Sequence, residues 1–79
     1  MTARVTLYSR PDCGLCDEAR DVVRGVRERV DFDLEEVDIS RDDALELEYG
    51  IRIPVVAVDG EELFEISVDP RALEAAVRR

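Results

Sequence analysis

Two cysteines, Cys13 and Cys16, stand three positions apart between a short β-type segment and a long helical pattern. Residues 5–8 are rich in strand formers, and the apolar residues after the pair recur at spacings of three and four. The start of a helix presents N–H groups without intrahelical partners and the positive end of the helix dipole, and both stabilise a thiolate. Because sulfurs at this spacing are neighbours, one can attack a mixed disulfide formed by the other. The pattern therefore indicates a thiol–disulfide redox centre between a strand and a helix.

The helical pattern also distinguishes the two sulfurs. Cys16 lies on the apolar, core-facing line of the helix. That line continues through Ala19, Val23, Val26 and Val30. Cys13 precedes the helical turns, where the unpaired N–H groups point outward. We therefore expect Cys13 to be the exposed nucleophile and Cys16 the shielded resolving thiol.

A cysteine pair can also be half of a zinc site or a structural disulfide. Zinc requires four N or S ligands, and this chain has no histidine and no third cysteine. A disulfide between residues three apart closes a very small loop and stabilises little. Both interpretations fit the sequence less well than redox chemistry, and no metal site is expected.

The length and charge of the chain limit its class. Seventy-nine residues make one small domain, taken as 1–79, and the net charge of −9 disfavours nucleic acid and anionic membranes as partners. No run is long and apolar enough to span a membrane, and the first residues lead into a strand rather than a signal peptide. We therefore expect a cytoplasmic monomer, in which a Cys-x-x-Cys motif is more often catalytic than structural.

The remaining pattern predicts seven elements in the order β-α-β-α-β-β-α. A strand over 4–8 precedes a helix from about 13 to about 30, and a strand with a bend or bulge follows over 32–37. Ser40 is expected to cap a short helix that ends at Gly50 in the left-handed conformation. Strands over 55–58 and 61–66 flank Asp59-Gly60, a type I′ hairpin signal. Asp69 then caps the last helix, with Pro70 at its first position.

With this motif, length and element order, the chain resembles the glutaredoxins of the thioredoxin superfamily, and it is most similar to the small bacterial glutaredoxin-like proteins. Residues 8–13, Tyr-Ser-Arg-Pro-Asp-Cys, match the strand end, basic residue and first cysteine of that family. The resemblance implies an α/β thioredoxin/glutaredoxin-like fold, with a four-stranded mixed sheet in order 2-1-3-4 flanked by three helices. It places the redox motif at the carboxyl end of the first strand.

The resemblance also implies further site residues. Ile53-Pro54 matches the family's apolar-proline pair, so Pro54 is expected to be cis and to face the disulfide in the catalytic site. The backbone of Ile53 would then pair with a bound thiol substrate. Arg10 stands where glutaredoxins usually carry a lysine that contacts a glutathione carboxylate, and Arg52 is expected to border the cysteine pair as a second cation. Asp69 would hold part of the γ-glutamyl end of glutathione.

Three departures from the family pattern bear on the electron donor. The residues between the cysteines are Gly14-Leu15 rather than Pro-Tyr, and Arg52 replaces a threonine. Ile66-Ser67 replaces the Gly-Gly pair before the last helix, where it crowds the glutathione position. Some redoxins of this shape are instead reduced by a flavin disulfide reductase of the thioredoxin-reductase type. Both glutathione and such a reductase remain open as donors.

The resemblance and the motif together predict a thiol-disulfide oxidoreductase that uses Cys13 and Cys16 to reduce protein disulfides or mixed disulfides. No bound cofactor is expected, and glutathione is a possible reducing cosubstrate. The alternative is an iron–sulfur cluster carrier. Carriers of this family typically have Gly-Phe-Ser after the first cysteine, and here Cys16 occupies the serine position while Gly14 is shared.

Overall fold

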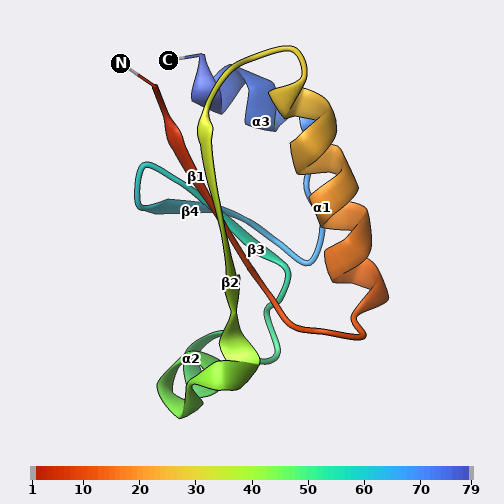
Figure 1. Cartoon of the computed structure of the whole chain (residues 1–79), viewed down its shortest axis with the longest axis vertical. Helices are drawn as coiled ribbons and strands as arrows, with labels where there is room; N and C mark the ends of the chain where they lie inside the picture. The colour runs from red at the N-terminus through yellow and green to blue at the C-terminus, as the bar shows by residue number, and fades with distance from the viewer. Residues whose placement is uncertain (1, 79) are drawn as a thin grey trace.

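The computed structural model describes residues 2–78. Its chain runs through four strands, three α-helices and one short 3₁₀ helix (Figure 1). The elements are β1 (Arg4–Ser9), α1 (Gly14–Arg27), β2 (Asp33–Asp38), η1 (Ile39–Arg41), α2 (Asp43–Tyr49), β3 (Val55–Val58), β4 (Glu61–Glu65) and α3 (Pro70–Val77). This is the predicted order of elements, with η1 added.

The four strands form one mixed sheet in the order β2-β1-β3-β4, as expected. β1 pairs in parallel with β2 and antiparallel with β3, and β3 pairs antiparallel with β4. β1 therefore lies inside the sheet, and its carboxyl end leads directly to the cysteine motif. Figure 1 shows α1 and α3 side by side, whereas α2 lies at the opposite end of the molecule from α3.

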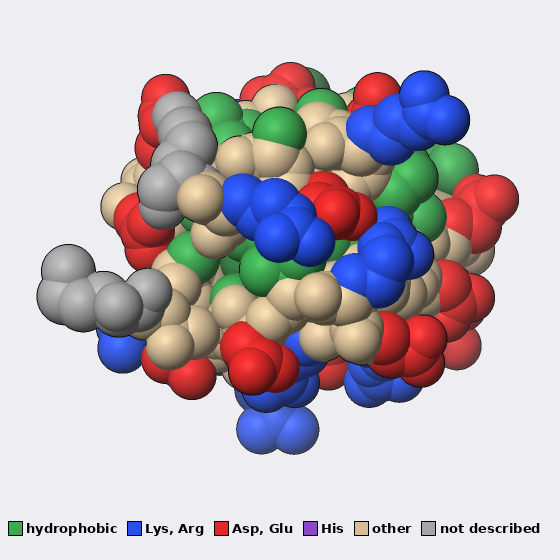
Figure 2. All heavy atoms as spheres, turned by 90° about the horizontal axis from the view of Figure 1, so that it is seen from above, with side chains coloured by type: hydrophobic (Ala, Val, Ile, Leu, Met, Phe, Trp, Pro, Cys, Tyr) green, Lys and Arg blue, Asp and Glu red, His purple; other side chains and the backbone are tan. Residues whose placement is uncertain are grey.

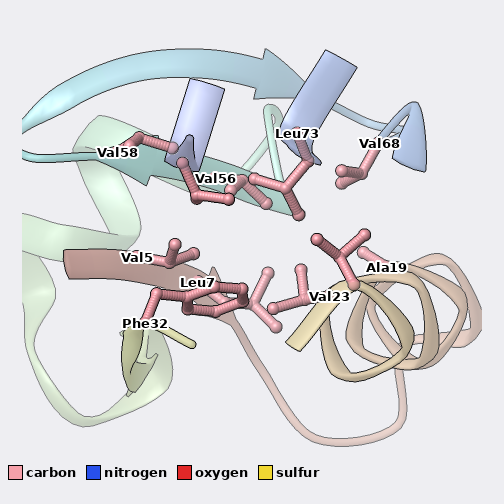
Figure 3. Packing of buried hydrophobic residues seen from close by; sticks show 11 residues of the cluster. Val5, Leu7, Ala19, Val23, Phe32, Val56, Val58, Val68 and Leu73 are labelled. Carbon is pink, nitrogen blue, oxygen red and sulfur yellow. The ribbon is translucent and has the colours of Figure 1, made fainter. Parts of the chain in front are cut away.

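The main core lies between the sheet and the helices α1 and α3 (Figure 3). The alternation of β1 directs Val5 and Leu7 into it, and both are fully buried. Val56 and Val58 enter the same core from β3. The helices contribute Ala19, Val23, Val26, Leu73 and Val77. This core fixes α1 against β1, and so fixes the direction in which α1 begins.

A second, smaller cluster lies beneath the cysteine motif. Cys16, Ile39 and Ile53 are its buried members. Partly buried residues around them are Tyr8, Cys13, Leu45 and Tyr49. This cluster connects the start of α1 with α2 and with the loop that precedes β3.

Two predicted boundaries were wrong. α1 ends at Arg27 rather than near Val30, because the following residues form a turn in which the N–H groups of Arg29 and Val30 both donate to the carbonyl of Val26. β2 begins after Phe32 and pairs with β1 in an unbroken register, without the predicted bend. The irregularity in the sheet lies instead between Val56 and Ala57, where β3 pairs with β4.

The predicted caps of α2 were also wrong. Ser40 lies in η1, where its N–H and hydroxyl donate to Asp38. Asp42 caps α2 instead, because its carboxylate accepts the N–H groups of Ala44 and Leu45 at the helix start.

Gly50 is not left-handed; its φ is −51°. A Cβ at this position would lie 2.5 Å from the carbonyl oxygen of Glu46, so close approach of the backbone explains the glycine.

The predictions for the last third of the chain were more accurate. Asp59 and Gly60 have φ values of 52° and 87°, which fits the predicted hairpin turn. Asp69 caps α3 by accepting the N–H of Arg71 at 2.9 Å, and Pro70 is the first residue of the helix. β4 ends at Glu65, one residue earlier than expected. Among residues 2–78, no helix has the length and apolar character needed to cross a membrane.

Candidate functional site

The loop after β1 brings Cys13 to the start of α1. Cys13 is the N-cap residue of α1, with an extended backbone, and Gly14 is the first helical residue. The Sγ atom of Cys13 accepts the backbone N–H of Cys16 at 3.2 Å. A side chain that caps a helix in this way carries negative charge favourably, because the N–H group and the helix dipole both face it. The Sγ atom of Cys13 therefore lies at the start of the helix, in contact with its backbone.

Cys16 lies one turn further along α1 and is fully buried. Burial raises the pKa of its thiol to about 11, and a hydrogen bond between the Cys16 and Cys13 side chains acts in the same direction. The backbone of Arg10 and the charge of Arg20 oppose this shift of the pKa. Cys16 is therefore a protonated thiol at neutral pH. Cys13 is only half-buried, so the two sulfurs differ in exposure in the predicted sense.

The loop before β3 lies against the same small cluster. Pro54 is fully buried, and the Ile53–Pro54 peptide bond is cis. The side chain of Ile53 packs in the cluster that contains Cys16. Its N–H donates to the carbonyl of Tyr49 at 3.1 Å, so this donor is already used within the chain. The carbonyl of Pro54 accepts the N–H of Ile66 at 2.8 Å, which ties this loop to the segment before α3.

Arg52 is held by carboxylates of its own chain. Its guanidinium pairs with Glu48 at 3.3 Å, with Glu65 at 2.7 Å and with Glu62. It also lies over the ring of Tyr49, 5.2 Å from the ring centre. Hydrogen bonds to Glu62 and Glu65 raise the pKa of Arg52 further above its usual value. The predicted second cation for an anionic substrate is therefore neutralised, and it links the loop before β3 to α2 and β4.

Arg10 and Arg20 lie around a hollow of about 290 Å³ on the β1 side of α1. Arg10 pairs with Glu46 of α2 at 3.2 Å. Arg20 pairs with Asp17 at 2.8 Å and with Glu36 at 2.6 Å. Arg10 lies in the loop between β1 and α1, and its charge too is matched by a carboxylate.

Sequence reasoning missed an aromatic stack beside the cysteines. The rings of Tyr8 and Tyr49 lie 4.2 Å apart and are nearly parallel, at 15°. The hydroxyl of Tyr49 donates to Glu62 at 2.9 Å, and burial together with this bond raises the pKa of Tyr49. The only sequence signal was an aromatic residue at the end of a strand and another at the end of a helix. Their pairing depends on how α2 returns to β1.

The segment before α3 contains a strained residue that the sequence did not reveal. Ile66 has a φ of 70°, and the N–H of Ser67 donates to the carbonyl of Glu65 at 2.7 Å. This is the hydrogen bond and the φ of a γ-turn with positive φ, which is rare and strained. A β-branched residue is especially unfavourable there. Ile66 is 44% exposed, so this strained residue presents an apolar side chain at the surface.

This strain predicts an unusual order of stability at position 66. Ile66→Gly is expected to be more stable than Ile66→Ala by about 1 kcal/mol, because alanine keeps the steric penalty of positive φ and glycine does not. Urea denaturation of the two variants measures the difference.

The matched control lies on the exposed side of α3, where Ala75→Gly is expected to lose about 1 kcal/mol relative to the parent chain. An Ile66→Ala variant that equals or exceeds Ile66→Gly in stability would contradict a positive φ at this residue.

Asp69, which was expected to hold part of glutathione, lies at the start of α3. The carboxylate of Asp69 is engaged as the cap of α3 through the N–H of Arg71. Within the described range 2–78, no group of three or more cysteine, aspartate or glutamate side chains has an arrangement that could hold a metal ion.

A four-stranded mixed sheet in this order, with a Cys-x-x-Cys pair at the start of the helix after the first strand, defines a protein of the thioredoxin superfamily. A family model described as "Glutaredoxin-like domain (DUF836)" matches residues 4–78. The chain belongs to this glutaredoxin-like family.

Several known proteins are similar to this chain in sequence or structure. An uncharacterized protein of Mycobacterium tuberculosis is 28% identical over 96% of this chain and 84% of its own length. The crystal structure of a structural-genomics target from X. campestris is 39% identical, with a TM-score of 0.76 over 90% of this chain and 91% of that chain.

A protein from Nitrosomonas europaea, solved by NMR, is 25% identical, with a TM-score of 0.83 over 98% and 93% of the two chains. A thioredoxin variant from Halobacterium salinarum is 26% identical, with a TM-score of 0.71 over 98% and 73%. The fold, the family and the cysteine pair support a thiol redox role.

Proposed function

We propose that this protein is a thiol–disulfide oxidoreductase that reduces protein disulfides or mixed disulfides through Cys13 and Cys16. The observation that carries the proposal is the asymmetry of the two sulfurs. The sulfur of Cys13 caps α1 and accepts an N–H at 3.2 Å, whereas Cys16 is buried behind it with a raised pKa. One sulfur is thus prepared for attack, and the other is protected until a mixed disulfide forms.

The reaction proceeds in two exchange steps. The thiolate of Cys13 attacks one sulfur of the substrate disulfide, the substrate S–S bond breaks, and the departing thiolate takes a proton from water. Cys16 then loses its proton and attacks the Sγ atom of Cys13, which releases the second substrate thiolate. Two electrons pass from the dithiol to the substrate, and a Cys13–Cys16 disulfide remains.

We further propose that a flavin disulfide reductase, rather than glutathione, returns the two electrons. Glutathione is an anion and needs cations beside the cysteines. The arginines at this end of the fold are paired with carboxylates: Arg10 with Glu46, and Arg52 with three partners. The side chain of Ile66 also occupies surface next to the helix that Asp69 caps. These features favour a protein donor over a small anionic thiol.

The test compares two electron donors on the oxidised, purified chain. One assay contains NADPH and thioredoxin reductase, and the other contains NADPH, glutathione reductase and glutathione. Consumption of NADPH in the presence of a protein disulfide measures turnover. We expect turnover with thioredoxin reductase and little with glutathione. Faster turnover with glutathione would refute the proposed donor, and a chain that exchanges with no disulfide would refute the function itself.

A further inference from the structure

An apolar groove lies beside the cysteine motif, between the start of α1 and the turn before α3. Its volume is about 210 Å³, and Leu15, Val22, Ile66 and Val68 line it together with Glu18. Leu15 stands between the two cysteines, so the groove begins at the motif itself. Leu15 is 48% exposed and Ile66 is 44% exposed, so two large apolar side chains of the groove are open to solvent.

The backbone holds the outer wall of this groove in place. The N–H of Ile66 donates to the carbonyl of Pro54, and the next N–H closes the turn back to Glu65. Ile66 therefore stays at the rim although its φ is positive. The opposite wall is the first part of α1, which the main core fixes through Ala19. The groove is thus a formed feature of the fold.

The charge around the groove is negative. Asp12, next to Cys13, and Glu18, in the groove wall, form no ion pair with any residue in the described range 2–78. At the end of the molecule that carries the termini, Figure 2 shows basic side chains interspersed with acidic ones, and Arg29, Arg71 and Arg78 line one hollow there together with Glu74. An anionic occupant, or a second copy of this chain with its net charge of −9, is repelled from the groove.

We propose that this groove docks the substrate: a protein segment that carries an apolar residue beside its disulfide-bonded cysteine and a basic residue next to it. The apolar side chain lies between Leu15 and Ile66, and the basic side chain meets Glu18 in the groove wall. This inference rests on the proposed function, because docking there matters only if Cys13 attacks the bound disulfide. Charge complementarity selects the basic partner over a neutral one.

Four short peptides test the proposal with the whole reduced chain under single-turnover conditions. Each has leucine or serine before its cysteine, and arginine or glutamate before that. The cysteine is a mixed disulfide with thionitrobenzoate, whose release is followed by absorbance. Because thionitrobenzoate is the better leaving group, Cys13 attacks the peptide sulfur. We expect the Arg-Leu peptide to react at least about tenfold faster than the Glu-Ser peptide at low salt.

Matched variants locate the selectivity. Leu15→Ala is expected to reduce the preference for leucine over serine at least about threefold, whereas Leu47→Ala, on exposed α2, leaves it unchanged. Glu18→Gln is expected to reduce the preference for arginine over glutamate at least about twofold, whereas Glu35→Gln, on the exposed side of β2, leaves it unchanged. Equal effects from the groove variants and their controls would overturn the docking site.

A small disulfide of thionitrobenzoate with mercaptoethanol separates the two hypotheses. If it reacts and the four peptides react at one rate, or if the glutamate peptides react fastest, the docking proposal is overturned while the proposed function stands. If neither the small disulfide nor any peptide reacts, the proposed function is overturned, and the docking proposal with it. The docking site is supported if the Arg-Leu peptide reacts fastest and the Glu-Ser peptide slowest, and if the preferences among the peptides change only in Leu15→Ala and Glu18→Gln.

Discussion

Replacing Cys13 with serine is expected to lower the rate of disulfide reduction at least about a thousandfold, because a hydroxyl at the helix start does not form the attacking anion at neutral pH. The serine oxygen can still accept the N–H of Cys16, so the helix cap is retained and the fold is expected to be preserved. Circular dichroism and urea denaturation check this point. Retained exchange activity in Cys13→Ser would show that the nucleophile is misassigned.

Cys16→Ser is expected to behave differently. The nucleophile survives, so Cys13 still forms a mixed disulfide with the substrate, but no internal thiol resolves it. The covalent complex should accumulate and be visible by mass spectrometry under non-reducing conditions. With thioredoxin reductase as donor, turnover should fall nearly to zero. With glutathione as donor, external thiol would resolve the complex and turnover would persist, so this variant also discriminates between the donors.

Alkylation of the unmodified chain provides an independent check of the two roles. Burial raises the pKa of Cys16 to about 11, so its reactive thiolate form is fully present only above that pH and falls tenfold for each unit below it. Iodoacetamide at neutral or mildly acidic pH should therefore label Cys13 first. Preferential labelling of Cys16 in the folded chain would contradict the arrangement described above.

The parts of this fold that sequence predicted correctly have short-range causes. Asp59-Gly60 specifies its turn because both residues tolerate positive φ, and Asp69-Pro70 starts a helix through one carboxylate and one fixed φ. The exposure of the two cysteines follows from the helical period alone. The prediction that Ser40 caps α2 was wrong because Ser40, Asp42 and Asp43 all have side chains that can cap a helix. The sequence does not decide which of them precedes the first helical turn.

The parts of the site that sequence did not predict depend on residues far apart in the chain. Arg52 was expected to act as a second cation beside the cysteines, but β4 brings Glu62 and Glu65 to its guanidinium once the hairpin has formed. Tyr8 and Tyr49 stack only because α2 packs back against the end of β1. Isoleucine is a residue type typical of strands. The positive φ of Ile66 arises from the hydrogen bond that its N–H donates to Pro54 and from the turn closed by the N–H of Ser67.

Leu73→Ala is expected to destabilise the fold by about 3 kcal/mol, within the range of 2–5 kcal/mol for buried leucines. Leu73 is fully buried on α3, in the core that also holds Val56 and Val68 (Figure 3). A domain of this size has a stability of about 4–12 kcal/mol, so the loss is a large fraction of the total. The midpoint of thermal unfolding should fall by more than about 10 °C.

The matched control is Leu47→Ala, since Leu47 is 90% exposed on α2 and its truncation should cost less than about 0.5 kcal/mol. Urea denaturation of both variants measures the contrast, and equal midpoints would contradict the packing of α3 on the sheet. The same helix follows directly after the turn that carries Ile66. Attack by Cys13 requires only the start of α1, whereas docking also requires the turn before α3. In Leu73→Ala, we therefore expect a range of temperatures in which the small disulfide still reacts with Cys13 but the four peptides react at similar rates.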